Sequence, residues 1–297
     1  MTVENVIFTT INTIFLIFTG MVMLYPYLNT IAVSLNEGYD TLRGGIHFWP
    51  RVFTWQNYEA VFSMGSIQTA FTVSVARTVI GAALSVVTTA MLAYTLSRKN
   101  YVFRHFITIV FVMTMYFNAG MIPNYFLIQS LGLKNTFAVY IIPGMVSAFN
   151  VIVIRTYMSS LPESLVESAR IDGAGDFTVF FRIMFPLAKP VLATVALFCA
   201  VGAWNSWFDN YIYNSGSPHL VTLQLELMKL VNSTTSLGQN SSAIHGAGVG
   251  ESTAAGMVTP KSIRSAITIV ASLPILLVYP FLQKYFVTGL TIGSVKG

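Results

Sequence analysis

Six long stretches of this chain are apolar and contain no Asp, Glu, Lys or Arg. They run over 5–36, 78–97, 106–133, 135–154, 190–208 and 265–283. Each is close to or longer than the roughly 20 residues with which a helix crosses a bilayer. We therefore predict an all-α membrane protein, with residues 1–297 forming one transmembrane domain. The predicted spans lie at about 6–35, 75–97, 106–130, 135–157, 188–209 and 264–284.

Composition supports a membrane protein and excludes several other classes. The chain is 54% hydrophobic and 9% charged, whereas about a quarter of the residues of a soluble domain are charged. The net charge of +5 comes from scattered basic residues, which does not favour nucleic-acid binding. Cys199 is the single cysteine and the four histidines lie far apart, so we expect no disulfide, no metal site and no catalytic residues.

The distribution of Lys and Arg predicts the orientation of the chain. The connection 98–105 carries three of them and no acid, and 155–189 carries four more. The connection between the third and fourth spans has only Lys134. Since basic loops stay in the cytoplasm, these two connections and both termini are predicted to be cytoplasmic, although the N-terminus itself has no Lys or Arg.

Arg77 lies at the edge of the second span and allows two interpretations. A charge at the centre of a membrane helix costs about 3 kcal/mol on insertion scales. We favour a position at the outer interface, where the side chain reaches the headgroups and 66–76 forms an extracytoplasmic lead-in. The alternative is a buried functional arginine.

A charged segment, 159–186, separates the fourth and fifth spans. It is predicted to form a helix from about Leu161 to Ile171, which begins with a capping box at Ser160 and Glu163. Gly173 is predicted to end this helix in the left-handed conformation.

A second helix should follow, capped by Asp176 and ending at Pro186. Glu167 and Arg170 are three residues apart and can pair on the first helix. From these features alone, the segment could also be an amphipathic connector lying in the membrane interface.

The spacing within this segment resembles the Glu-Ala-Ala loop of ABC-importer permeases. The matching positions are Glu167-Ser168-Ala169, Gly173, Ile183 and Pro186, with Ser168 and Phe185 as departures from Ala and Leu. The resemblance implies the type I ABC-importer permease fold, in which this loop is the coupling helix that docks on a cytoplasmic ATPase. The residues it assigns to that contact are Glu167, Ser168, Ala169, Arg170, Asp172, Gly173 and Ala174.

The resemblance extends over nearly the whole chain. The ending "GLTIGSVKG" resembles that of carbohydrate-uptake permeases, the branch typified by the maltose importer's smaller permease, and "FTWQNYEAVF" also matches. The connection 211–263 is longer than in that branch and resembles importers of oligosaccharides and polysaccharide fragments, including alginate-type and lipoprotein-dependent ones.

What this family does is therefore the expectation for this chain. Since the chain has no G-x-x-x-x-G-K-[ST] phosphate-binding loop, ATP and Mg are expected on the partner ATPase, with no cofactor bound by this chain. The expected partners are a homologous second permease, which would make a heterodimer, two copies of the ATPase, an extracytoplasmic sugar-binding protein and the lipid bilayer. The expected location is the bacterial cytoplasmic (inner) membrane.

A sugar path needs aromatic faces and neutral hydrogen-bonding groups. The candidates are Tyr116, Asn118, Asn150, Trp204, Asn205, Trp207 and Asp209. Aromatic residues at the membrane interface and helix-bridging Asn side chains would give the same pattern. In the maltose-type branch, moreover, the partner permease can hold most ligand contacts.

Three other classes remain open. An ion-coupled carrier normally places acidic or His residues inside its spans, and Asp209 only borders one. A membrane scaffold could use 159–186 as a docking peptide, and an ABC permease could carry a solute other than sugar. The connection 211–263 either contacts the binding protein or is a surface insertion.

Overall fold

The computed structural model describes residues 3–239 and 258–294. Within them the regular structure is helical, apart from one isolated antiparallel bridge between Asn36 and Phe53. The chain divides into two compact units. The first contains the described residues up to Gln68 and those of Glu226–Pro274, and the second contains Thr69–Leu225 and the residues from Ile275 onward.

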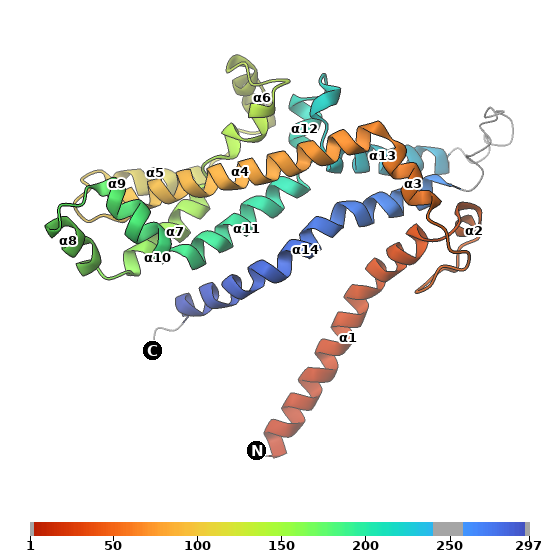
Figure 1. The fold of residues 1–297 in the computed structure, drawn as a ribbon, viewed down its shortest axis with the longest axis horizontal. Helices are drawn as coiled ribbons and strands as arrows, with labels where there is room; N and C mark the ends of the chain where they lie inside the picture. The colour runs from red at the N-terminus through yellow and green to blue at the C-terminus, as the bar shows by residue number, and fades with distance from the viewer. Residues whose placement is uncertain (1–2, 240–257, 295–297) are drawn as a thin grey trace. The chain divides into compact units, whose positions relative to one another are not determined.

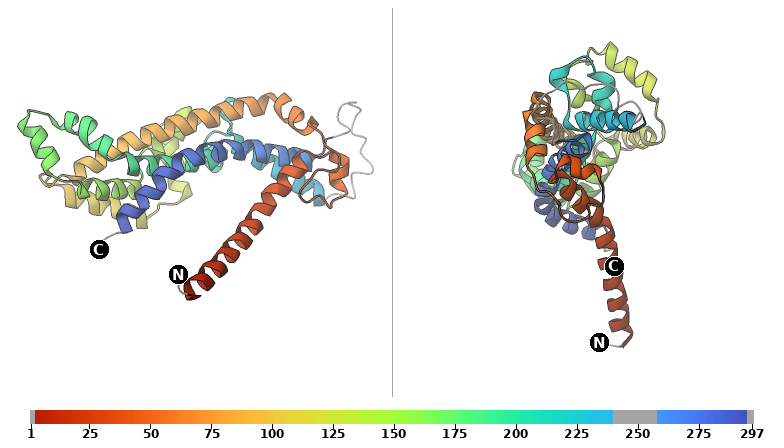
Figure 2. Two further views of the ribbon diagram at one scale, coloured as in Figure 1. Left: turned by 60° about the horizontal axis from the view of Figure 1, so that its bottom comes forward. Right: turned by 90° about the vertical axis from the view of Figure 1, so that its right-hand side faces the viewer.

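The first unit begins with α1 (Val3–Ser34), one unbroken helix (Figure 2). It is apolar around its whole circumference, and none of its most apolar window is buried within the chain. Such a helix is stable only where lipid or another protein surrounds it. After α1 come the short α2 (Gly38–Leu42) and α3 (Gln56–Ser63), and Ala32, Val33 and Ile46 form a small core.

The first unit also contains the start of α14 (Pro260–Ser294). Thr259 caps this helix, because its Oγ1 accepts a hydrogen bond from the Ser262 N–H at 3.3 Å while the Ser262 hydroxyl accepts from the Thr259 N–H at 3.1 Å. The helix therefore begins four residues before the predicted boundary at 264.

In the second unit, α4 (Gly65–Ser97) and α11 (Lys189–Asn205) run side by side (Figure 1). Beside them lie α7 (Ala148–Ser160), α8 (Ser164–Ile171) and α9 (Asp176–Val179), followed by the π-helix η3 (Phe180–Met184) and α10 (Phe185–Leu187). These elements share one core, which contains Ala90, Tyr94, Ile154, Met158, Val166, Ala169, Phe180, Met184, Val191 and Val195. The short helices of 164–187 are therefore packed against the long ones.

Three of the predicted spans, the third, fourth and fifth, are not single helices. The third, predicted over 106–130, consists of α5 (Arg104–Tyr116) and α6 (Met121–Ser130). The chain breaks between them because Gly120 has φ +88° and its N–H bonds the Asn118 side chain at 2.8 Å. The fifth, predicted over 188–209, ends as α11 at Asn205, and α12 (Phe208–Tyr213) follows after a two-residue break.

The fourth predicted span is bent. It consists of the 3₁₀ turns η1 (Phe137–Tyr140) and η2 (Ile142–Gly144) and then α7, with a 49° angle between the two parts. The Met145 carbonyl at the break accepts a hydrogen bond from Thr88 of α4 at 3.0 Å. A neighbouring helix thus supplies the bond that the broken helix lacks, as expected inside a membrane.

Length and apolarity identify α1, α4 and the 260–280 part of α14 as helices that can each cross a membrane, among the described residues. Two bent pairs, 137–160 and 176–205, raise this number to five if each pair is one span. With 13 residues, α5 is too short to cross alone. After α12, η4 (Pro218–Leu220) precedes α13 (Leu223–Gln239). The rest of the connection 211–263 falls partly on residues 240–257, which lie outside the described ones.

Candidate functional site

The charged segment forms a helix that ends as its sequence predicts and begins later than predicted. The helix α8 starts at Ser164, and its first turn has no side-chain cap. The predicted capping box is wrong, because the Ser160 hydroxyl instead bonds the Tyr157 carbonyl at 2.7 Å, in the last turn of α7. The helix therefore starts three residues after the predicted Leu161.

Gly173 ends α8 in a complete Schellman motif. Its φ is +80°, its N–H bonds the Arg170 carbonyl at 3.0 Å, and the next N–H, that of Ala174, bonds the Ala169 carbonyl at 2.9 Å. The prediction of a left-handed glycine here is confirmed. The turn brings Asp176 back to α8, where its carboxylate pairs with Arg170 at 3.0 Å. The predicted pairing of Arg170 with Glu167 is therefore wrong, and Asp176 is the first residue of α9 rather than its cap.

One face of α8 is packed and the other is exposed. Val166 and Ala169 are buried against Phe180 and Met184 in the core of the second unit. The exposed face carries Glu167, Ser168, Arg170, Ile171 and Asp172. Of the seven residues that the resemblance assigns to ATPase contact, Ala169 is buried, Ala174 is half-buried and the other five are exposed. The packed face thus holds α8 against the core, while the opposite, mainly polar face is exposed.

Two further contacts connect the entrance of α8 to α4. Lys99, just after α4, forms an ion pair with Glu163. This hydrogen bond from Lys99 lowers the pKa of Glu163 below its ordinary value of 4.5. Arg155 of α7 donates to the Leu96 carbonyl at 3.1 Å. The start of α8 is thus connected to the end of α4, and α7 is connected to α4 as well.

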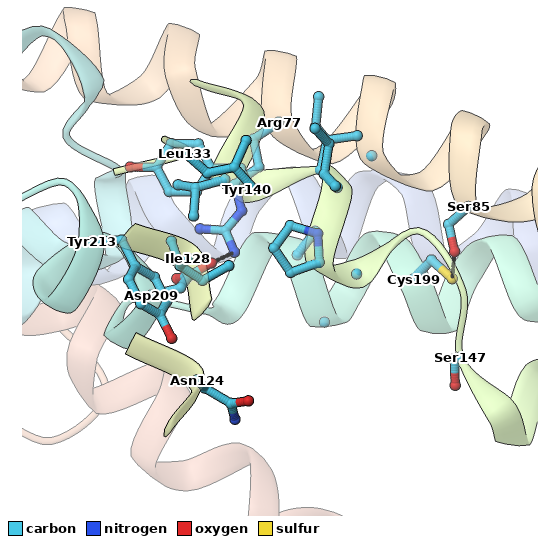
Figure 3. A pocket seen from close by; sticks show the side chains of 18 of the residues that line it. Arg77, Ser85, Asn124, Ile128, Leu133, Tyr140, Ser147, Cys199, Asp209 and Tyr213 are labelled. Carbon is cyan, nitrogen blue, oxygen red and sulfur yellow. Dashed lines mark hydrogen bonds and ion pairs between the residues drawn. The ribbon is translucent and has the colours of Figure 1, made fainter. Parts of the chain in front are cut away.

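A cavity of about 590 Å³ lies within the second unit (Figure 3). Arg77, Tyr140 and Asp209 line one end, and Ser85 and Cys199 line the other. The remaining polar residues of the wall are Asn124, Ser147, Asn150 and Tyr213. Its size and its mixture of apolar and polar groups suit a small ligand.

Arg77 is buried, which corrects the prediction that it lies at the membrane interface. Its side chain is 4% exposed and forms an ion pair with Asp209, which is 26% exposed. The guanidinium also donates to the Ser206 carbonyl at 3.1 Å and lies 4.7 Å from the centre of the Tyr140 ring. Asp209 in turn accepts from the Ser206 hydroxyl at 2.8 Å and from the Asn210 N–H at 3.0 Å. Pairing and hydrogen bonding thus replace the hydration of both charges.

This ion pair joins α4 to the break between α11 and α12. Next to it, the Tyr140 hydroxyl and the Asn210 amide both donate to the Leu220 carbonyl, at 2.6 and 2.7 Å. The network satisfies the Ser206 carbonyl at the break, through Arg77, and the Leu220 carbonyl at the end of η4. It also leaves no net charge at this end of the cavity, since Arg77 and Asp209 neutralise each other.

The structure brings two of the predicted sugar-path residues to the cavity, Asn150 and Asp209. The Asn150 amide donates to the Cys199 sulfur at 3.4 Å. Trp204 is buried against Phe71, and Trp207 packs on Phe208 and Tyr211. The others, Tyr116, Asn118 and Asn205, are exposed and do not line this cavity.

Sequence reasoning missed Arg77, Ser85, Tyr140 and Tyr213 as cavity residues. The available signal was that Arg77 borders the second apolar stretch while an acid, Asp209, borders the fifth. Within the described part of the chain, no three His, Cys, Asp or Glu side chains are arranged to hold a metal ion.

Broken helices around a cavity of mixed polar and apolar lining, beside a helix with an exposed charged face, are features found in membrane transport proteins. Comparison with known proteins agrees. Residues 90–292 match the family of binding-protein-dependent transport system inner membrane components. Since that match covers more than half of the chain, this protein belongs to that family, in which it is the membrane permease subunit and not the catalytic one.

Individual relatives match over nearly the whole chain. Protein LplC of Bacillus subtilis (strain 168) is 36% identical over 292 residues, 98% of this chain and 95% of its own. The polygalacturonan/rhamnogalacturonan transport system permease protein YtcP of the same strain is 34% identical over 284 residues, 95% and 96% of the two chains. The predicted family and the all-α permease fold are confirmed, whereas the described residues show three to five spans, so that the number six stays a prediction.

A solved structure is also similar. It is a crystal structure of a bacterial ABC transporter involved in the import of the acidic polysaccharide alginate. The matching chain has a TM-score of 0.85 and 28% identity, with 96% of this chain and 99% of that chain covered.

Proposed function

We propose that this chain is the permease subunit of an ATP-driven importer that carries an oligosaccharide or polysaccharide fragment across the bacterial cytoplasmic membrane. The observation that carries the proposal is the likeness, over almost the full length of both chains, to the permease of an alginate importer. The similarity to a permease for polygalacturonan and rhamnogalacturonan favours fragments of acidic polysaccharides. A carrier coupled to ions is disfavoured, because Arg77 neutralises Asp209.

The helix α8 is the proposed contact with the ATPase. Its exposed polar face is suited to a soluble partner, and its buried face is suited to transmitting motion into α4, α7 and α11. The complete Schellman motif at Gly173 and the Arg170–Asp176 pair fix the shape of the exposed end. ATP and Mg would bind only to the ATPase, two copies of which would serve this chain and a second, homologous permease.

The cavity is the proposed contribution of this chain to the translocation pathway. Tyr140 and Tyr213 offer aromatic rings, and Asn124, Ser147 and Asn150 offer neutral hydrogen-bonding groups. Both suit a saccharide, which has apolar C–H faces and many hydroxyls. An extracytoplasmic sugar-binding protein would deliver the ligand, with α8 and both termini in the cytoplasm and with six crossings in all.

The test is transport by the complete assembly in proteoliposomes, with ATP inside and the binding protein outside. The probes are oligogalacturonate, alginate oligosaccharide and a neutral comparison, raffinose. We expect ATP-dependent uptake of an acidic oligosaccharide. Uptake that persists without the ATPase would contradict the proposal. Uptake of raffinose alone would agree with an oligosaccharide importer but contradict the preference for acidic fragments.

A matched pair of variants tests the role of α8. Gly173→Pro cannot adopt a φ of +80° and should abolish both ATPase co-elution and uptake. The control is Gly175→Ala, because Gly175 has an ordinary φ of −74° and open space around an added Cβ. Retained co-elution in Gly173→Pro would count against α8 as the contact.

A further inference from the structure

The turn between α4 and α5 gathers three basic side chains around one carboxylate. Lys99 forms an ion pair with Glu163. The hydrogen bond from Lys99 holds the pKa of Glu163 below its ordinary value, and the positive charges of Arg98 and Arg104 act in the same direction. All three cations therefore lie close to this carboxylate. We call residues 98–104 the basic turn.

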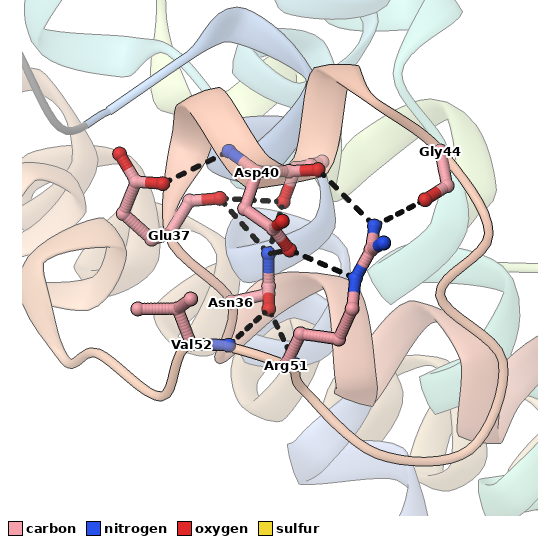
Figure 4. Close-up of polar contacts among 7 residues, drawn as sticks. Asn36, Glu37, Asp40, Gly44, Arg51 and Val52 are labelled. Carbon is pink, nitrogen blue, oxygen red and sulfur yellow. Dashed lines mark hydrogen bonds and ion pairs between the residues drawn. The ribbon is translucent and has the colours of Figure 1, made fainter.

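The two arginines of the basic turn lack the compensation that other arginines of the chain have. Arg51, for example, pairs with Asp40 at 3.1 Å and donates to the Gly44 carbonyl (Figure 4). Arg98 and Arg104 form no ion pair of their own among the described residues. Three cations that share one carboxylate leave the basic turn with an excess of two positive charges.

Neutral contacts hold one of these arginines in place. The Arg98 guanidinium donates to the Ser97 hydroxyl through two nitrogens, at 3.1 and 3.2 Å, and lies 5.0 Å from the centre of the Tyr94 ring. The Arg104 guanidinium donates no hydrogen bond within the described part of the chain. Both arginines are half-buried, so that each can still reach a ligand at the surface.

Large apolar side chains are exposed between and beside these cations. Val102 is 86% exposed, Phe103 is 61% exposed and Phe106 is 67% exposed. The basic turn follows α4, which is long and apolar enough to cross a membrane, and precedes the apolar α5, which has no buried residue among those described. A charged turn that joins two apolar helices of this kind belongs at a membrane surface.

The combination of basic and apolar groups indicates the class of ligand. The phosphate of an anionic phospholipid carries its negative charge next to the hydrocarbon region, so that a single lipid can meet both the guanidinium groups and the exposed apolar side chains. Arginine suits this contact, because its planar set of N–H donors matches phosphate oxygens. An acidic soluble protein would compensate the charges but would have to cover the apolar side chains as well.

We propose that Arg98 and Arg104, with Lys99 beside them, form a binding site for the phosphate of an anionic phospholipid, and that the exposed apolar side chains of the basic turn insert among the surrounding lipids. The lipid compensates the excess positive charge. Because Lys99 also pairs with Glu163, the bound phosphate lies next to the start of α8. The proposal requires that α4 crosses the bilayer and does not depend on the transported substrate.

The test is native mass spectrometry of the purified assembly in a neutral detergent, to which phosphatidylglycerol or phosphatidylcholine is added. The first lipid has a net negative charge and the second has none. The test variant is Arg98→Gln with Arg104→Gln. The matched control is Arg182→Gln with Lys189→Gln, which removes two cations from exposed side chains elsewhere in the second unit. Comparison with the wild type removes the contribution of lipids that are bound to partner chains.

We expect the test variant to bind phosphatidylglycerol about 30-fold more weakly at one site, because each basic residue near an anionic lipid contributes about fivefold. The control variant should bind it as the wild type does, and binding of phosphatidylcholine should be the same in all three proteins. Arg98→Lys with Arg104→Lys keeps both charges and should retain most of the affinity.

If the double Gln variant does not assemble, Arg104→Gln alone provides the measurement, with an expected loss of about fivefold. Unchanged affinity for phosphatidylglycerol in the test variant would overturn the proposal, as would an equal loss in the control variant. Loss of the ATPase from the test variant, with lipid binding unchanged, would mean that a protein covers the basic turn, and this result would overturn the proposal too.

Discussion

Removal of Asp209 alone from the Arg77–Asp209 pair should be more harmful than removal of both charges. Breaking a buried ion pair by deleting one partner costs about 3–5 kcal/mol, because the other charge stays buried without compensation. The two single variants should also differ. Asp209→Asn leaves the guanidinium of Arg77, which is 4% exposed, without its counterion and should cost about 3–5 kcal/mol.

Arg77→Met should cost less, about 1–3 kcal/mol. The remaining Asp209 keeps its hydrogen bonds from Ser206 and Asn210, and with 26% exposure it borders the cavity, where water can solvate it. The double variant, Arg77→Met with Asp209→Asn, leaves no uncompensated charge. It should therefore be more stable than Asp209→Asn alone. The loss of stability in the double variant should then be smaller than the sum of the two single losses by at least about 1 kcal/mol.

The assay is thermal stability of the purified assembly, followed by size-exclusion chromatography after heating. In domains of about 150–250 residues, each kcal/mol corresponds to about 2–4 °C in Tm. The exposed Lys99–Glu163 pair provides the control cycle, since charges that water solvates should couple much more weakly than the Arg77–Asp209 pair. If the effects of Arg77→Met and Asp209→Asn simply add, the two charges do not depend on each other and the reasoning is refuted.

Three further predictions concern α8 and the cavity. Gly173→Ala should lower the free energy of unfolding by about 1–2 kcal/mol, because a left-handed φ of +80° strains any side chain. The control, Gly175→Ala, should change it by no more than about 0.5 kcal/mol. Equal melting temperatures of the two variants would contradict this. Glu163 has a folded-state pKa below 4.5, so the Lys99 pair stabilises the protein above the unfolded pKa and this contribution is lost as the pH falls through the folded value. The melting temperatures of wild type and Lys99→Met should thus differ at pH 7 and converge as the pH falls below the lowered, folded-state pKa of Glu163. A constant difference would count against the pair. Gly81→Phe should fill the cavity and slow the labelling of Cys199 by a small thiol reagent. Gly65→Phe, on the same helix but outside the cavity, should leave the labelling rate unchanged. Equal rates in the two variants would show that the reagent reaches the thiol by another route.

The features that the sequence predicts well are local. A charge-free apolar stretch identifies a membrane segment without knowledge of its neighbours, as for α1 and α14. Gly173 was predictable because its conformation depends on the end of one helix, and the Schellman hydrogen bonds confirm it. The family resemblance depends on residue spacing within 159–186 and on short motifs such as "GLTIGSVKG", and the match over residues 90–292 supports it.

The features that the sequence predicts poorly depend on partners that are distant in the chain. Arg77 seemed too costly to bury because its counterion, Asp209, is 132 positions away in the chain. Arg170 pairs with Asp176 instead of Glu167, since the turn at Gly173 brings Asp176 close. The break in the third span follows from Gly120, whose effect is invisible in a count of apolar residues. The Met145 and Ser206 carbonyls likewise need donors from α4, which only the folded chain supplies.

The most direct test of the account is the identity of the molecule that α8 touches. Ile171, at the end of α8, is 86% exposed, and a photoreactive benzophenone amino acid can replace it in the complete transporter. The control carries the same group at Phe126 of α6, which is 64% exposed. We predict that illumination links position 171 to the ATPase subunit and that position 126 gives no such product. A product with lipid alone at position 171 would show that α8 is an interfacial connector and would contradict the account.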